Sequence, residues 1–238
     1  MPPILDLQFM LAVIPRLLKV LPVTLQITVV SMALAMLLAL ATALVRIYRV
    51  PALRQLAALY VSFARGTPLL VQIYLAYYGL PAVLNHLQTR GGWGLDATGI
   101  PAIAFIYFAF TLNVGAYSSE TIRASIEAID KGQMEAALSV GMTTWQGMRR
   151  IVLPQAFTIA LPSLGNTAIS LLKDTSLAFL ISVVELMGEA KIQGARGLQF
   201  FEVYIVVALI YWAVCIVVER LVAVLERRVR RYEGLMAP

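Results

Sequence analysis

The sequence has one cysteine, one histidine and few charged residues, and each shortage excludes a class of function. Cys215 is the only cysteine, so neither an internal disulfide nor a cysteine metal cluster can form. His86 is the only histidine, which leaves zinc sites and histidine-based catalysis without the residues they need. No Gly-Lys-Ser or Gly-Lys-Thr of a phosphate-binding loop occurs. We therefore expect a protein that is not an enzyme and holds no metal or cofactor of its own.

Charged residues make up only 13% of the 238 residues, whereas 60% are hydrophobic. Soluble domains carry about 25% charged residues, so this composition is typical of a membrane protein. The net charge of +6 comes from basic residues that flank apolar stretches. Such flanking charges orient a protein in the bilayer, so we expect no nucleic-acid partner.

Five apolar stretches approach the length of ~20 residues that a membrane-spanning helix needs. They cover about 20–45, 56–84, 100–117, 154–184 and 203–218. The second is interrupted near Arg65–Pro68 and the fourth at Lys173–Asp174. Residues 1–19 carry apolar side chains at helical spacing, which predicts an N-terminal helix lying at the membrane interface. We predict an all-α membrane protein with five transmembrane helices in a single domain, 1–238.

The basic residues divide unequally between the two sides of the predicted bundle, and the richer side is expected to be cytoplasmic. This places the N-terminus outside, the C-terminus in the cytoplasm, and the segment between the third and fourth spans also in the cytoplasm. The richer side holds Arg46, Arg49, Arg54, Arg123, Lys131, Arg149, Arg150, Arg220, Arg227, Arg228, Arg230 and Arg231, and the other side holds Arg16, Lys19, Arg90, Lys191 and Arg196.

The cytoplasmic segment 131–154 is a polar hairpin within an otherwise apolar chain. Its pattern predicts a first helix around 135–138, a break at Gly141, and a second short helix capped by Thr143-Thr144. A hairpin of this size has no hydrophobic core of its own. It is therefore either a surface held by a partner protein or a solvated connection between two spans.

The hairpin resembles the coupling loop of bacterial ABC importer permeases. The matching residues are Glu135-Ala136-Ala137, Gly141, and Ile151 followed by Leu153-Pro154. Residues 63–70, 115–123 and 172–177 resemble the polar amino-acid branch of those permeases, which includes histidine, glutamine, arginine and cystine transporters. Within that branch the chain most resembles the cystine and cysteine permeases.

The resemblance implies a permease in the bacterial inner membrane that works with several partners. These are two ATP-binding subunits holding ATP and Mg²⁺, a second copy or paralogue of the permease, and an extracytoplasmic protein that delivers an amino acid. The ATP-binding subunits would hold the hairpin, and the bulky side chains of Met142, Trp145 and Met148 would fill a groove there. The residues implied in coupling are Glu135, Ala136, Ala137, Gly141, Met142, Trp145, Leu153 and Pro154.

Charged side chains at membrane depth are costly and usually face a cavity or a partner. For an amino-acid substrate we expect Asp174 to bind the ammonium, and Arg65 or groups around Thr67 to bind the carboxylate. Alternatively, Arg65, Lys173 and Asp174 form an ion-pair network that braces the broken helices. The candidate pathway residues are Arg65, Gly66, Thr67, Gln72, Tyr74, Lys173, Asp174, Thr175 and Ser176.

Two further groups of charged residues lie near the ends of the predicted spans. Glu120 and Arg123 are three residues apart on a predicted helix and are expected to pair. An outer loop after the fourth span is predicted to hold Glu185, Glu189, Lys191 and Arg196. This loop either docks the delivery protein or is simply solvated.

A gradient-driven carrier or channel is the rival function. It would also carry charges at membrane depth, but it does not account for the hairpin.

Overall fold

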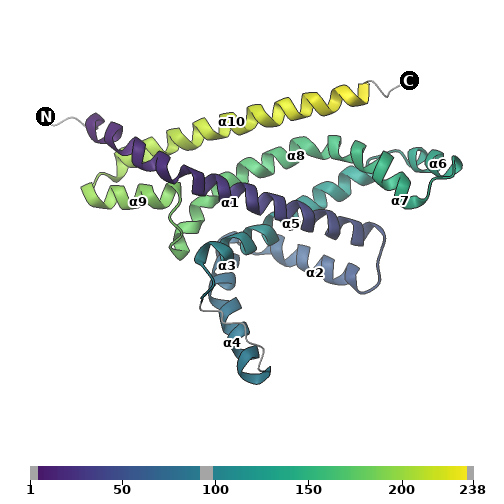
Figure 1. Ribbon diagram of the computed structural model, residues 1–238, viewed down its shortest axis with the longest axis horizontal. Coiled ribbons are helices and arrows are strands. Elements are labelled where there is room, and N and C mark those ends of the chain that lie inside the picture. Colours follow the sequence, from purple (N-terminus) through teal and green to yellow (C-terminus); the bar gives the residue numbers. More distant parts are fainter. Residues whose placement is uncertain (1–4, 92–98, 235–238) are drawn as a thin grey trace.

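The computed structural model describes residues 5–91 and 99–234, and every regular element in these ranges is helical (Figure 1). Short π-helical turns, Leu75–Gly79 and Met148–Val152, lead into the fourth and eighth helices. The helices are α1 (Leu7–Ile47), α2 (Leu53–Gly66), α3 (Leu69–Tyr74), α4 (Leu80–Gly91), α5 (Ala102–Glu127), α6 (Lys131–Ser139), α7 (Thr144–Gly147), α8 (Leu153–Asp174), α9 (Leu186–Gly197) and α10 (Phe200–Gly234). The predicted all-α class is confirmed.

Within residues 5–91 and 99–234, three helices are long and apolar enough to cross a membrane: α1, α5 and the Phe200–Val229 part of α10. Two further pairs of helices reach that length only across a bend, of 114° after Gly66 and of 55° after Ile181. The predicted number of five spans is reached when each bent pair counts as one. The 114° bend follows from Thr67-Pro68, because a residue before proline avoids the helical region and Thr67 is extended (φ −121°, ψ 147°).

Residues 7–19 are the first part of α1 and do not form a separate helix. No helix-ending residue follows them, and α1 runs without interruption for 41 residues with Pro15 and Pro22 inside it. Membrane helices tolerate such prolines. Val13 and Leu17 are buried against Leu186 of α9 and against α10. The interfacial location of 1–19 stays a prediction, and residues 1–4 lie outside the described part of the chain.

The two ends of the bundle differ in what they carry (Figure 1). The start of α1 and α9 lie together at one end, and α6 and α7 lie at the other. Leu38 lies against Gly115 and Arg46 binds Glu120, so α1 and α5 run side by side in the same direction. The hairpin therefore sits where α1 and α5 end. The orientation of this end toward the cytoplasm stays a prediction.

The predicted outer loop after the fourth stretch is wrong. The α-helical part of that stretch ends at Asp174 and tightens into a 3₁₀ helix, Thr175–Ile181, before the chain bends at Ser182 into α9. Glu185 is fully buried there. It accepts hydrogen bonds from the Gly188 backbone N–H (2.8 Å) and from the Tyr211 hydroxyl (2.9 Å). A carboxylate that caps a helix satisfies its backbone donors, which is why this acidic residue lies inside the fold.

The turn between α1 and α2 contains a strained residue that gives a stability prediction. Ala52 has φ 60° and ψ −51°, and the Leu53 N–H donates to the Pro51 carbonyl across it (2.7 Å). This γ-turn conformation is unfavourable for any residue with a Cβ atom. We expect Ala52→Gly to raise the free energy of unfolding by about 1 kcal/mol, measured by thermal unfolding in detergent. Ala58→Gly, at an exposed position inside α2, should lower it by about 1 kcal/mol. Equal destabilisation by both changes would contradict the prediction.

Candidate functional site: a helical hairpin and a polar cavity

The segment between α5 and α8 forms the predicted helix–turn–helix. The Asp130 side chain caps α6 by accepting from the Gly132 N–H (2.6 Å). Gly141 has φ +82°, a conformation that favours glycine. The Thr143 side chain then caps α7, and the Gln146 side chain accepts from the Thr143 N–H (2.8 Å), which completes a capping box. The predicted break and cap are confirmed.

The hairpin packs tightly on itself and on the ends of two spans. A Cβ atom at Gly147 would lie 2.8 Å from Met134 Sδ and 3.3 Å from Ala137 Cβ, so the glycine allows α6 and α7 to approach closely. Ala137 is only 1% exposed. Below them a small apolar cluster joins the hairpin to α1 and α5. Its members are Ile126, Met148, Val152 and Ala156, with Leu44, Ile47, Ile122, Ile129, Met134 and Leu153 around them.

The exposed surface of the hairpin combines apolar side chains with one acidic residue, and basic residues lie near its ends (Lys131, Arg149 and Arg150). Glu135 and Ala136 are exposed, and Trp145 is 58% exposed. Leu138 and Val140 are also exposed, at 46% and 73%, and sequence reasoning did not single them out. Met148 is buried in the cluster below, so it does not offer a side chain to a partner's groove. Of the other predicted coupling residues, Pro154 is exposed, whereas Met142 and Leu153 are partly buried.

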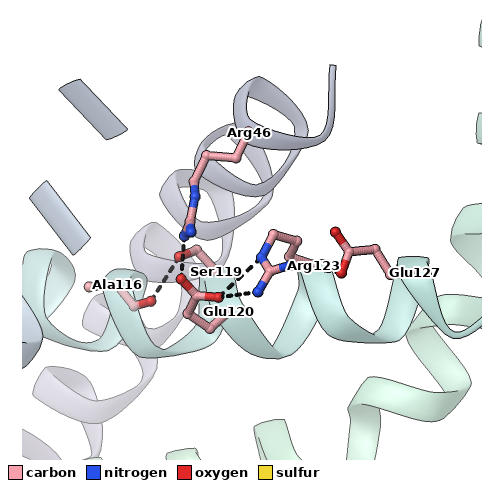
Figure 2. Close-up of polar contacts among 6 residues, drawn as sticks. All are labelled: Arg46, Ala116, Ser119, Glu120, Arg123 and Glu127. Carbon is pink, nitrogen blue, oxygen red and sulfur yellow. Dashed lines mark hydrogen bonds and ion pairs between the residues drawn. The ribbon is translucent and has the colours of Figure 1, made fainter. Parts of the chain in front are cut away.

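Next to the hairpin, charged residues tie α1 to α5 (Figure 2). One oxygen of Glu120 accepts from the Arg46 guanidinium. The other accepts from Arg123 through Nε (3.1 Å) and Nη2 (2.8 Å). Arg123 also binds Glu127 (2.7 Å). The predicted Glu120–Arg123 pair is confirmed, whereas Arg46 was missed because 74 residues separate it from Glu120.

A cavity of about 520 Å³ lies between α5, α8 and the break between α2 and α3. It is within the usual ~300–1,000 Å³ range for sites of small molecules. Thr67 from the break and Asp174 from the end of α8 both line it, so two of the predicted pathway residues meet in one cavity. The other lining residues are Pro68, Leu69, Asn113, Val114, Tyr117, Ser163, Asn166, Thr167, Ser170, Leu171 and Leu177.

A polar stripe on α8 forms one wall of this cavity, and sequence reasoning missed it. Asn166, Thr167 and Ser170 lie three, four and seven residues after Ser163, which places all four on one helical face. Asp174 extends the stripe by one more turn. This helical periodicity of polar residues within an apolar stretch was a readable signal. The wall offers hydroxyls, an amide and a carboxylate, groups that can bind an ammonium or a carboxylate ligand.

Gln72 holds the break between α2 and α3 in place and does not line this cavity. Its Nε2 donates to the Ala64 carbonyl (2.8 Å) and to Thr67 Oγ1 (2.9 Å). Its Oε1 accepts from Asn113 Nδ2 (3.1 Å). The bond to Ala64 replaces a missing helical hydrogen bond, because the Ala64 carbonyl would normally accept from the N–H of residue 68 and proline has no N–H. Gln72 therefore shapes the cavity indirectly, through Thr67 and Asn113.

The remaining predicted pathway residues lie around the cavity without lining it. The guanidinium of Arg65 stacks on the ring of Tyr117, 5.5 Å from its centroid, and Tyr117 is a lining residue. Thr175 is fully buried and donates to the Leu172 carbonyl (2.7 Å). The others are exposed Gly66 and Lys173 and partly buried Tyr74 and Ser176. Among the described residues, no salt bridge joins Arg65 or Lys173 to Asp174, so the alternative of a bracing ion-pair network receives no support.

Comparison with known proteins identifies the family. The family model described as "Binding-protein-dependent transport system inner membrane component" matches residues 31–231, most of the chain. The chain belongs to this family. The match spans the α2–α3 break, the hairpin and the polar stripe of α8, so every part of the candidate site falls within the family's common domain.

Known permeases resemble the chain over nearly its whole length. It is 44% identical over 215 residues to the probable amino-acid ABC transporter permease protein PatM of Vibrio harveyi, covering 90% of this chain and 92% of that one. It is 45% identical over 210 residues to the L-cystine transport system permease protein TcyB of Bacillus subtilis (strain 168), covering 88% and 84%. A chain in the crystal structure of an amino acid ABC transporter with histidines matches at a TM-score of 0.79 and 34% identity, covering 95% and 100%. The predicted resemblance to amino-acid ABC permeases is confirmed.

Proposed function

We propose that this permease forms the transmembrane pathway of an ATP-driven importer for a polar amino acid, with cystine as the first candidate substrate. A binding protein would deliver the amino acid to the end of the bundle that carries α9. Two ATP-binding subunits would act at the other end, in the cytoplasm, and a second permease chain would complete the pathway. The protein would reside in the bacterial inner membrane.

The single observation that carries this proposal is the hairpin of α6 and α7. It is anchored on α1 and α5 through the apolar cluster that contains Met134 and Met148, yet it leaves Glu135 and Trp145 exposed. A patch that combines exposed apolar side chains, including a tryptophan, with charged ones is common at protein interfaces. A partner that holds this patch can move the ends of the spans, because the hairpin is packed against them. A gradient-driven carrier works without ATP-binding subunits, so it does not require a surface that binds them.

The polar cavity supports an amino acid as the substrate class. An amino acid carries both an ammonium and a carboxylate, so its site needs an acidic group and separate donors. Asp174 supplies the first, and the hydroxyls of Ser163 and Ser170 with the amide of Asn166 supply the second. The similarity to TcyB makes cystine the first amino acid to test.

Reconstitution tests the proposed function. The permease, its ATP-binding subunits and its binding protein are placed in liposomes, and uptake of labelled cystine and other polar amino acids is measured with internal ATP or with an imposed proton or sodium gradient. We expect uptake only with ATP. Uptake driven by a gradient in the absence of the ATP-binding subunits would favour the carrier and would contradict the proposal.

A further inference from the structure

One carboxylate bridges the ends of two spans that also pack through apolar side chains. Glu120 uses its two oxygens separately, one for Arg46 of α1 and the other for Arg123 of its own helix (Figure 2). Among the described residues, the Arg46–Glu120 pair is the only salt bridge between two helices, since the other two salt bridges both lie within α5. The side chains of Arg46 and Glu120 are 22% and 21% exposed, so water and salt screen them only in part.

The helical turns of α1 and α5 that carry Arg46 and Glu120 also carry residues that pack against the hairpin. Arg46 lies between Leu44 and Ile47 on α1, and Ile122 lies between Glu120 and Arg123 on α5. These three apolar residues pack around Met148 and Val152, which follow α7. Apolar contacts are non-directional and permit sliding. Charge-assisted hydrogen bonds fix both distance and orientation.

We propose that Glu120 is a positioning residue for energy coupling: it locks α1 to α5, so that a displacement of the hairpin moves both spans as one body. This inference rests on the proposed function, because it presupposes an ATP-binding subunit that displaces the hairpin. Without the lock, the hairpin could shift against α5 while α1 stayed behind. ATP would still be hydrolysed, but less of the movement would reach the cavity.

The chain contains a matched control for this role. Glu127 also binds Arg123, but it lies four residues further along the same helix and its side chain is 54% exposed. Replacing it removes one carboxylate and one ion pair of Arg123 without touching the connection between α1 and α5. Both Glu120→Gln and Glu127→Gln remove one negative charge. Only Glu120→Gln also removes the ion pair between α1 and α5.

The test measures uptake and ATP hydrolysis by the full complex in liposomes. We expect Glu120→Gln to lower the amount of amino acid transported per ATP by about 3- to 10-fold, with hydrolysis nearly unchanged. Glu127→Gln should leave this ratio at the wild-type value. Arg46→Gln should reproduce the effect of Glu120→Gln, and the double variant should be no worse than either single variant, because both remove the same bond. Should Glu120→Gln fail to fold, Arg46→Gln alone carries the test.

Three results would overturn the proposal. The first is an unchanged amount of amino acid transported per ATP in Glu120→Gln or Arg46→Gln. This holds even if the melting temperature falls, because a lower melting temperature alone marks a bond that is purely structural. The second is an equal loss in Glu127→Gln. The third is a double variant whose loss is the product of the single losses. A wild-type complex without ATP-driven uptake is a distinct result, because it rejects the proposed function itself and this inference with it.

Discussion

Asp174→Asn is expected to lower ATP-driven uptake by about 10- to 100-fold, because a hydrogen bond to a charged group contributes about 1.5–3 kcal/mol. Asp174 is the carboxylate among the residues that line the cavity, and no salt bridge in the described part of the chain neutralises it. A substrate ammonium would be its natural partner. Asparagine keeps the size of the side chain and one acceptor oxygen but removes the charge that attracts an ammonium. The loss is measured as initial uptake rates over a range of substrate concentrations.

Lys173→Gln is the matched control for Asp174→Asn. Lys173 is the adjacent residue and is also charged, but it is exposed and does not line the cavity. We expect its replacement to change uptake by less than about twofold, as is usual for exposed charges. Unchanged substrate affinity and rate in Asp174→Asn would remove this residue from the site and leave the cavity without its ammonium partner.

Glu135→Lys is expected to weaken binding of the ATP-binding subunits by about 100-fold, since a misplaced charge at an interface costs about 3 kcal/mol. Glu135 is exposed on α6 and makes no salt bridge with a described residue. A basic group on the partner would therefore meet a free carboxylate. Reversing its charge should release the ATP-binding subunits during purification in mild detergent and abolish uptake, while the permease still inserts and melts as the wild type does.

Gln133→Lys provides the control on the same helix. Gln133 is exposed as well, but two residues of α6 turn it by about 200° away from Glu135. It therefore introduces a lysine on the other side of the hairpin. Retention of the ATP-binding subunits by Gln133→Lys and their loss from Glu135→Lys would define which face is held. Full retention by Glu135→Lys would contradict a coupling role for this residue.

The parts of the fold that follow from local chemistry were predictable from the sequence. Gly141 fixes the turn of the hairpin and Thr143 caps its second helix, because a positive φ and free backbone N–H groups select these residue types. Thr67-Pro68 ends α2 because a proline constrains the residue before it. These features depend on neighbours within a few residues, so their position in the chain was sufficient to locate them.

The parts that depend on distant residues were not predictable. Arg46 and Glu120 meet because α1 and α5 run parallel, a relation that a single sequence does not contain. Glu185 was expected in an outer loop and is buried, because Tyr211 and the start of α9 satisfy it. The polar stripe from Ser163 to Ser170 had a visible helical spacing, but its function as a cavity wall depended on where the break at Thr67 lies.

The central claim, that the hairpin is the joint with the ATP-binding subunits, is tested most directly by site-specific crosslinking. Because Cys215 is the only cysteine, Cys215→Ala gives a cysteine-free chain into which Trp145→Cys introduces one thiol at an exposed position of α7. Leu198→Cys, at a residue that is 84% exposed after α9, is the control at the opposite end of the bundle. Each thiol carries a photoreactive maleimide in the assembled complex. The account predicts a crosslink to the ATP-binding subunit from Trp145→Cys, with a yield that changes on ATP addition, and none from Leu198→Cys. No crosslink from Trp145→Cys, or an equal yield from both positions, would contradict it.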